Sequence, residues 1–484
     1  MKFIHKINSV ARNKVFLYVS SRYVTYGLQF VNSIILAVVL KDYFPVYGFI
    51  LIILQYISLT NLGVPYSLNV FLALNKDNDE KMDKYLSTSV LIYLFLFILI
   101  SAFFYILPHC GIHIGTKYQF DNYVLFVVAI GLLALLNALM SNYYRVINRL
   151  GEIVFLQSVI PLGVFVALLF AKGEFLLDLI LWIMFLGNLI ALVLFLKNKK
   201  SKKWMPDLSL VNPILRKAFF LFLYNTFFYL ILLSIRTLVS SEYSISDFAL
   251  FTFSFTIANA IVLLFESFAF LIYPKTINRL NKADTTEVFR ILDVIKVNYV
   301  TSIHLAMYLF ILLYPFLVSF FPQYNTTFKC FALITMTISL YSNCFAYSSF
   351  LTAKGKEKLL SVLAFMALTI NVLIALAISS LLKLSYEYMI LSTMVAYLIY
   401  TVFLGIATVR ILRVEMSMIE LVKSVFPFRL FFPFAFLLVL ILICVPLVYF
   451  VAALALFIFT NRTQLTGILK TIKRILSDSS IIDI

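Results

Sequence analysis

LYVSSRYVTYGLQFVNSIILAVVL, residues 17–40, is the stretch that decides the fold class. A helix of this length crosses about 30 Å of hydrocarbon, the thickness of a bilayer core. The stretch is too long for the apolar region of a signal peptide and has no small-residue cleavage site, so we expect it to remain as a spanning helix. It contains an arginine, Arg22, whose placement at the centre of a bilayer costs roughly 2.5–3.5 kcal/mol.

Similar apolar runs recur along the whole chain. Of 484 residues, 63% are hydrophobic and 13% are charged, and the mean hydropathy is +1.01. This composition excludes a water-soluble globule and indicates a polytopic membrane protein. A further run, 426–460, is either one overlong span or two short ones that meet near Pro446, which makes 12 to 14 helices in all. The twelve clear spans are 17–40, 47–74, 85–107, 122–147, 153–171, 175–196, 218–240, 248–273, 297–320, 329–352, 359–382 and 388–409.

The positions of Lys and Arg orient these helices. Thirty-two of the 39 basic residues fall in alternate loops and termini, five fall in the opposite loops, and Arg22 and Arg236 lie within spans. Because short cytoplasmic loops collect Lys and Arg, we expect both termini to be cytoplasmic. The basic tail returns to the cytoplasm only if the last run is a hairpin, which favours fourteen helices. The net charge of +17 then reflects loops beside anionic lipid and indicates no nucleic-acid partner.

An internal repeat divides the chain. NRLGEIVFLQ from Asn148 aligns with TAKGKEKLLS from Thr352, at a shift of 204 residues, and a weaker match pairs segments beginning at Tyr43 and at about residue 243. Because each half holds an even number of spans, the halves share one orientation, as in parallel-repeat transporters. We predict an all-α protein with two six-helix bundles, 1–196 and 218–410, a basic cytoplasmic connector, 197–217, and a C-terminal hairpin with a basic tail, 411–484.

Three segments carry a resemblance to a known family: LGVP at 62–65, AFLIYPKTINRL at 269–280 and LYSNCFAYSSFLTAKGK at 340–356. With the spans and the repeat, residues 10 to 410 resemble the Wzx-type polysaccharide flippases of bacterial O-antigen and capsule pathways. Their superfamily includes multidrug and toxin exporters and flippases of lipid-linked peptidoglycan precursors. The resemblance implies a V-shaped pair of bundles in the bacterial inner membrane. The resemblance also implies that the protein works by alternating access and moves an undecaprenyl-diphosphate-linked oligosaccharide from the cytoplasmic to the outer leaflet. Membrane lipids and other polysaccharide assembly proteins are further expected partners.

Polar residues at helical spacing identify a candidate lumen. Five predicted helices carry them three, four or seven positions apart, which places them on one face of each helix. Hydroxyls and amides in membrane helices more often bind neighbouring helices, so any single residue has this alternative role. Stripes on five helices together favour a shared cavity. The candidate substrate-binding residues are Arg22, Tyr26, Gln29, Asn61, Asn137, Asn225, Arg236 and Asn259.

The charged candidates each have two interpretations. Arg22 and Arg236 either extend to the membrane interface or offer forked donors to a diphosphate. Arg236 is nearer the outer end of its span, which favours the interface there. Glu266 lies about eight residues, roughly 12 Å of helix, inside Pro274. It is either an ion-pair partner for an arginine or a cation site, and is our candidate for energy coupling.

The sequence contains no nucleotide-binding or hydrolase motif, namely no glycine-rich phosphate loop, HExxH or GxSxG. We therefore expect a secondary transporter rather than an enzyme, without cofactor or metal, driven by H⁺, Na⁺ or the membrane potential. One alternative is a polysaccharide polymerase or acyltransferase of the same pathway. A polymerase usually has a long polar outer loop, whereas the longest polar loops here, 197–217 and 274–296, are predicted to be cytoplasmic. The other alternative is a multidrug exporter.

Overall fold

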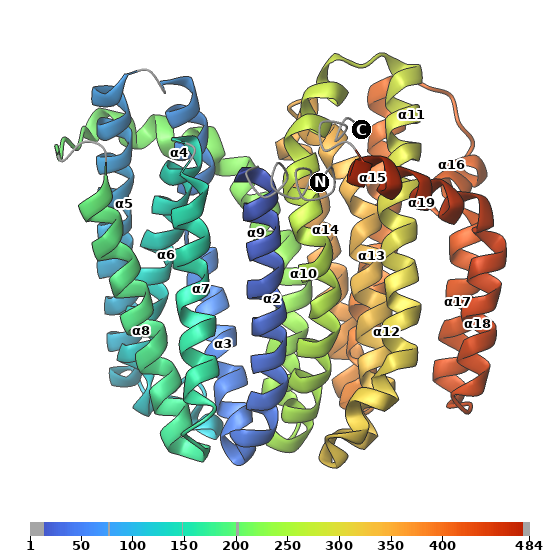
Figure 1. The fold of residues 1–484 in the computed structure, drawn as a ribbon, viewed down its shortest axis with the longest axis horizontal. Coiled ribbons are helices and arrows are strands. Elements are labelled where there is room, and N and C mark those ends of the chain that lie inside the picture. The colour runs from blue at the N-terminus through green and yellow to red at the C-terminus, as the bar shows by residue number, and fades with distance from the viewer. Residues whose placement is uncertain (1–13, 76–77, 148, 200–202, 478–484) are drawn as a thin grey trace, which may run out of the picture. The chain divides into compact units, whose positions relative to one another are not determined.

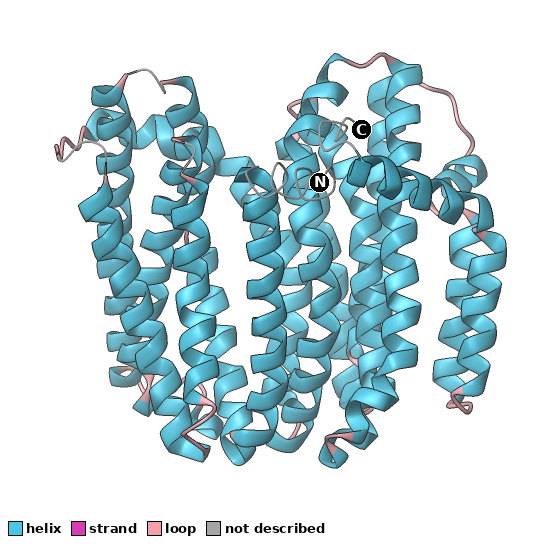
Figure 2. Ribbon diagram, in the orientation of Figure 1, coloured by secondary structure: helices cyan, strands magenta, loops and turns pink. Residues whose placement is uncertain are grey.

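The structure is a computed structural model that describes residues 14–75, 78–147, 149–199 and 203–477 (Figure 1). Figure 2 shows helices joined by short loops, with no strand over these ranges. Among the described residues, eleven helical segments are long and apolar enough to cross a membrane, or up to thirteen if each of two bent helix pairs counts as one span. The predicted all-α, many-span class is confirmed.

The chain divides into two compact units, Met1–Leu223 and Tyr224–Ile484. The division falls inside α9, Val211–Glu242, which begins in the first unit and ends in the second. The four predicted segment boundaries and the repeat relation between the halves stay predictions. The other helices of the first unit are α2 Lys14–Val39, α3 Phe44–Leu59, α4 Val64–Leu74, α5 Asp79–His109, α6 Val124–Val146, α7 Leu150–Ala167 and α8 Gly173–Asn198.

One predicted span of the first unit, 47–74, is broken into α3 and α4. Leu62 and Gly63 have φ values of 50° and 70°, in the left-handed region that ends a helix. Pro65 stands in the first turn of α4, where its missing N–H costs nothing. The LGVP segment is therefore a helix break, which hydropathy alone does not reveal.

Close packing of α7 on α8 depends on small residues. A Cβ atom at Gly163 would lie 2.7 Å from the side chain of Ile183, and one at Gly187 would lie 2.7 Å from Ile160. Because lipid is as apolar as the side chains, membrane helices associate through such close contacts rather than through the hydrophobic effect.

The second unit is built around α13, Phe328–Ala353, which is the most completely buried of its spanning helices. Its Ser-, Thr- and Ala-rich sequence lets α10, α12 and α15 pack closely against it. The remaining helices of this unit are α10 Ile245–Lys282, α11 Thr285–Ile295, α12 Thr301–Ser319, α14 Glu357–Leu376, α15 Ile390–Leu412, α16 Met418–Val425, α17 Phe428–Ile443, α18 Val448–Thr460 and α19 Arg462–Ser477.

The last apolar run folds as two short helices. α17 and α18 pack together across a turn at 444–447 that contains Pro446, so the hairpin alternative is confirmed. Arg429 closes the base of this hairpin, because its guanidinium donates to Asn461 Oδ1 at 2.7 Å and to Thr301 Oγ1 of α12 at 3.1 Å. α16 is bent by 74° from α17, and α19 by 72° from α18.

A buried amide joins three helices of the second unit. Asn371 of α14 is fully buried and donates to Ile231 O at 2.7 Å and to Ser234 Oγ at 3.1 Å, both on α9. Its Oδ1 accepts from the hydroxyls of Ser392 and Thr393 on α15, at 3.0 and 3.1 Å. The amide thus fixes the rotation of α14 between its neighbours.

Replacing Asn371 with leucine should loosen the second unit by about 2 kcal/mol, because four interhelical hydrogen bonds are lost at roughly 0.6 kcal/mol each. Cys330 and Cys344 are buried on α13 in the same unit, so the rate at which a thiol reagent labels them reports how often the unit opens. We expect roughly tenfold faster labelling of these two cysteines in purified protein. Thr369→Val, on the exposed face of α14, serves as the control, and equal labelling rates in both variants would contradict the assignment.

Candidate functional site

The first unit presents a polar face on α2. Arg22, Tyr26 and Gln29 lie there, all half-buried. The Arg22 guanidinium donates a hydrogen bond to the Tyr26 hydroxyl, and its carbon lies 5.2 Å from the centre of the Tyr26 ring. Residues four positions apart lie on the same face of a helix, so the two side chains are neighbours there. The contact therefore holds the guanidinium on the helix face.

The neighbouring strip of α2 is used for packing on α7. Thr25 and Ser158 hydroxyls are 2.8 Å apart, and Asn32 Nδ2 donates to Pro161 O at 2.7 Å. These contacts set the rotation of α2. The contacts with α7 therefore come from Thr25 and Asn32, and the polar face with Arg22, Tyr26 and Gln29 lies next to them on α2.

Two of the candidate amides have structural partners. Asn61 closes the break between α3 and α4, since its Nδ2 donates to Ser58 O at 2.9 Å and its Oδ1 accepts from Gly63 N–H at 2.8 Å. Asn137 joins α6 to α8, because its Nδ2 lies 2.9 Å from both the backbone and side-chain oxygens of Asn188. The alternative role of such residues, binding to protein rather than cargo, therefore accounts for their observed contacts.

The second unit holds the remaining candidates. Arg236 of α9 is 4% exposed, and its guanidinium carbon lies 4.7 Å above the centre of the Phe255 ring of α10. The guanidinium thus forms a cation–π contact inside the second unit, and both interpretations of Arg236 stay predictions. Asn225 and Asn259 are half-buried. Glu266 lies within α10, but its side chain is outside the described residues.

An ion pair that the sequence reasoning missed lies at the start of α5. Lys199 Nζ is 2.9 Å from Asp83 Oδ1, with side chains 6% and 4% exposed, and Lys199 also donates to Lys203 O at 3.1 Å. Asp83 stands just before a predicted span, and Lys199 stands in a basic loop where most charges are solvated. Asp83 and Lys199 are far apart in the sequence, and they meet because the connector folds back onto the start of α5.

The connector then runs along the first turns of α5. Met205 N–H donates to Ser87 Oγ at 3.3 Å, and Asp207 N–H donates to Thr88 Oγ1 at 3.0 Å. Hydrogen bonds from the hydroxyl and N–H of Ser209 hold the pKa of Asp207 below its ordinary value. The segment between the sixth and seventh predicted spans is thus bound to the first unit.

No metal centre accompanies these residues: in the part of the chain that the structure describes, no group of three or more His, Cys, Asp or Glu could hold a metal ion.

Comparison with solved structures places this architecture among known membrane proteins. An inward-facing multidrug resistance MATE family transporter of the MOP superfamily matches with a TM-score of 0.65 and 14% identity, over 83% of this chain and 99% of that chain. Lipid II flippase MurJ, in an inward closed conformation, matches with a TM-score of 0.57 and 16% identity, over 94% of this chain and 99% of that chain. A MATE structure in complex with MaD3S matches with a TM-score of 0.57 and 14% identity, over 82% of this chain and 94% of that chain.

No family model matches the sequence, and no curated protein matches it. At these identities the structural likeness establishes the fold. The chain is a multi-pass membrane protein with the fold of MOP-superfamily transporters.

Proposed function

We propose that this protein is a flippase for lipid-linked oligosaccharides. It moves undecaprenyl-diphosphate-linked repeat units from the cytoplasmic to the outer leaflet of the bacterial inner membrane by alternating access, for O-antigen or capsule synthesis, with both termini cytoplasmic. The observation that carries the proposal is the Arg22 guanidinium held on a spanning helix by Tyr26. A guanidinium kept in place offers forked donors to a diphosphate.

The candidate residues take different parts in this proposal. In the first unit, Arg22 and Tyr26 bind the diphosphate and the half-buried amide of Gln29 contacts sugar hydroxyls. In the second unit, the half-buried amides of Asn225 and Asn259 contact sugar hydroxyls. Asn61 and Asn137 act by positioning α4 and α6, because their amides already bind protein atoms. In the second unit, Arg236 contacts cargo only in a conformation that withdraws it from Phe255.

The share of the chain that each solved structure matches also supports a lipid-linked cargo. The MurJ structure covers 94% of this chain, whereas the MATE structures above cover 82–83%. A lipid-linked cargo is therefore favoured over a small one.

Multidrug export is the second candidate, favoured by the higher TM-score of the MATE structure, 0.65 against 0.57. The two functions separate in cells that lack the protein. For a flippase, lipid-linked repeat units accumulate and surface polysaccharide disappears, and the wild-type gene restores both. A drug exporter would change drug resistance and leave the polysaccharide intact, which would contradict our proposal.

The sign of the cargo suggests the source of energy. A diphosphate that leaves a cell with a negative interior moves downhill by about 2.3 kcal/mol per charge for each 100 mV. The potential can then drive export without ATP, but the empty cationic carrier must return. We assign this return step to Glu266, which pairs with an arginine or takes up H⁺ or Na⁺ when cargo is absent.

Glu266→Gln should slow turnover about tenfold or more while cargo affinity changes little, because the amide keeps the shape of the carboxyl group and loses its charge. The measurement is transport of lipid-linked oligosaccharide into proteoliposomes under an imposed potential or pH gradient. Glu242→Gln, at the exposed end of α9, is the matched control. If wild type and Glu266→Gln respond identically to each gradient, Glu266 has no coupling role.

A further inference from the structure

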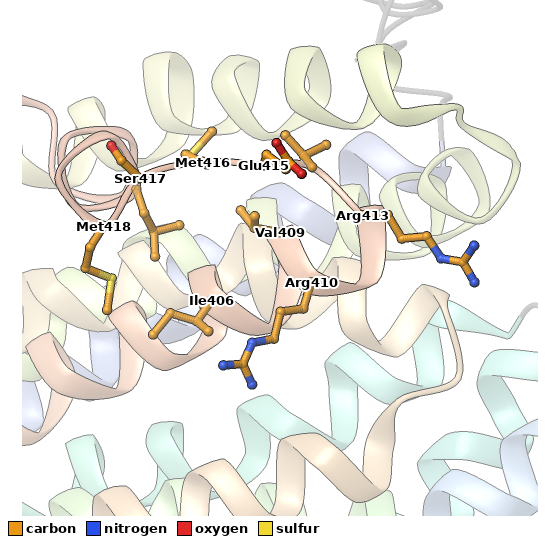
Figure 3. Close-up of a pocket in the computed structure, with 10 residues that line it drawn as sticks. Ile406, Val409, Arg410, Arg413, Glu415, Met416, Ser417 and Met418 are labelled. Carbon is orange, nitrogen blue, oxygen red and sulfur yellow. The ribbon is translucent and has the colours of Figure 1, made fainter.

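A cavity of about 840 Å³ lies at the junction of α15 and α16 in the second unit (Figure 3). Arg410 and Arg413, from the last turn of α15 and the residue after it, contribute the positive charge. Figure 3 shows the two side chains leaving the helix in different directions. The apolar wall consists of Ile406, Val409, Val414, Met416, Met418 and Leu421.

The cavity lies at the end of a helix that is long and apolar enough to span a membrane. The spanning segment of α15 ends at Leu412, directly before Arg413. On α16, next to the cavity, Met418, Ile419 and Val422 expose 58%, 69% and 40% of their surface. A short helix turned by 74° from α17 with aliphatic side chains exposed is typical of a segment that lies in the membrane interface.

The charge balance at the cavity is positive. Glu415 is the one carboxylate among its ten lining residues. The neighbouring Glu420 is held by Ser417, whose N–H and hydroxyl both lie 2.9 Å from Glu420 Oε2 as part of the cap of α16. Among the lining residues, two arginines against one glutamate leave one net positive charge, which attracts an anion.

The backbone of Arg413 adds an independent observation. Its φ is 55°, in the left-handed conformation that favours glycine, and it ends α15 with Val414 N–H bonded to Val409 O at 3.2 Å. A glycine would make this turn at lower cost. The chain instead keeps a long cationic side chain beside the cavity.

We propose that this cavity binds the phosphate headgroup of an anionic membrane phospholipid, with Arg410 and Arg413 contacting the phosphate and the apolar wall and α16 contacting the acyl chains. The shared chemistry is a phosphate anion, and the apolar surroundings favour the lipid over free phosphate. The site does not depend on the proposed cargo of the transporter.

The test uses native mass spectrometry to measure what stays bound to the full-length purified protein in detergent micelles. In three separate samples, the protein is mixed with phosphatidylglycerol, with phosphatidylcholine or with inorganic phosphate in the buffer. We expect retention of phosphatidylglycerol only. Arg410→Gln and Arg413→Gly should each weaken it about tenfold, the loss expected for one charge-assisted contact. Lys383→Gly is the matched control, because Lys383 is an exposed lysine at φ 49° outside the cavity lining.

Stability separates lipid binding from misfolding. Arg413→Gly removes the left-handed strain, so its unfolding midpoint without lipid should equal or exceed that of wild type while its lipid binding falls. Equal phosphatidylglycerol binding in wild type and both arginine variants would overturn the proposal. Equally tight phosphatidylcholine binding, or displacement of the lipid by millimolar inorganic phosphate, would also overturn it.

Discussion

Replacing Arg22 with alanine should abolish surface polysaccharide, with export at least about 100-fold lower, while the protein still inserts into the membrane. The variant loses the forked donors that bind the diphosphate, and two charge-assisted hydrogen bonds account for a loss of this size. Arg22→Lys should keep part of the activity, because the charge survives and the fork does not. The measurement is polymer quantified alongside protein abundance.

Two further variants locate the effect. Tyr26→Phe keeps the ring and removes the hydroxyl that holds the guanidinium, so it should give intermediate export. Val24→Ala, on the exposed face of the same turn, should behave as wild type. Full export by Arg22→Ala would mean that the side chain serves only to reach the membrane interface.

Asp83→Asn should destabilise the first unit by about 3–5 kcal/mol, because it leaves the Lys199 ammonium buried without its charge partner. The same loss is expected for Lys199→Met, which strands the carboxylate. The measurement is the midpoint of unfolding of the purified protein in detergent.

An exposed pair on the same helix provides the control. Glu80 and Lys84 are also 2.9 Å apart but are largely solvated, so Glu80→Gln should leave the midpoint unchanged. The double variant Asp83→Leu with Lys199→Met should regain most of the lost stability, because no charge remains buried. If Asp83→Asn and Glu80→Gln had equal midpoints, the buried pair would not anchor the connector.

Much of the fold was predictable from the sequence because lipid imposes one rule on every span. A run of about 20 apolar residues must be a helix, so periodicity and length place most helices. The break at Leu62 and Gly63 was not predictable from hydropathy, because both helices on either side are apolar. The choice between one long and two short C-terminal helices was supported by the basic tail, and the structure has the turn at Pro446.

The candidate site was less predictable, because a polar residue in a span has the same appearance whether it binds cargo or another helix. Asn32 and Asn137 donate to backbone oxygens of α7 and α8, and nothing in their sequence positions distinguishes this role from contact with cargo. The burial of Arg236 under Phe255 and the pairing of Asp83 with Lys199 depend on contacts across helices or loops that no local pattern encodes.

The central claim, export of a lipid-linked diphosphate oligosaccharide, is tested most directly with purified protein in proteoliposomes. Labelled undecaprenyl-diphosphate oligosaccharide is placed in the inner leaflet, and its exposure to an impermeant sugar-cleaving enzyme outside is followed with an inside-negative potential. We predict exposure that increases with the potential for wild type and stays at the protein-free level for Arg22→Ala. No exposure above that level with folded wild-type protein, together with transport of a small drug by the same vesicles, would contradict the account.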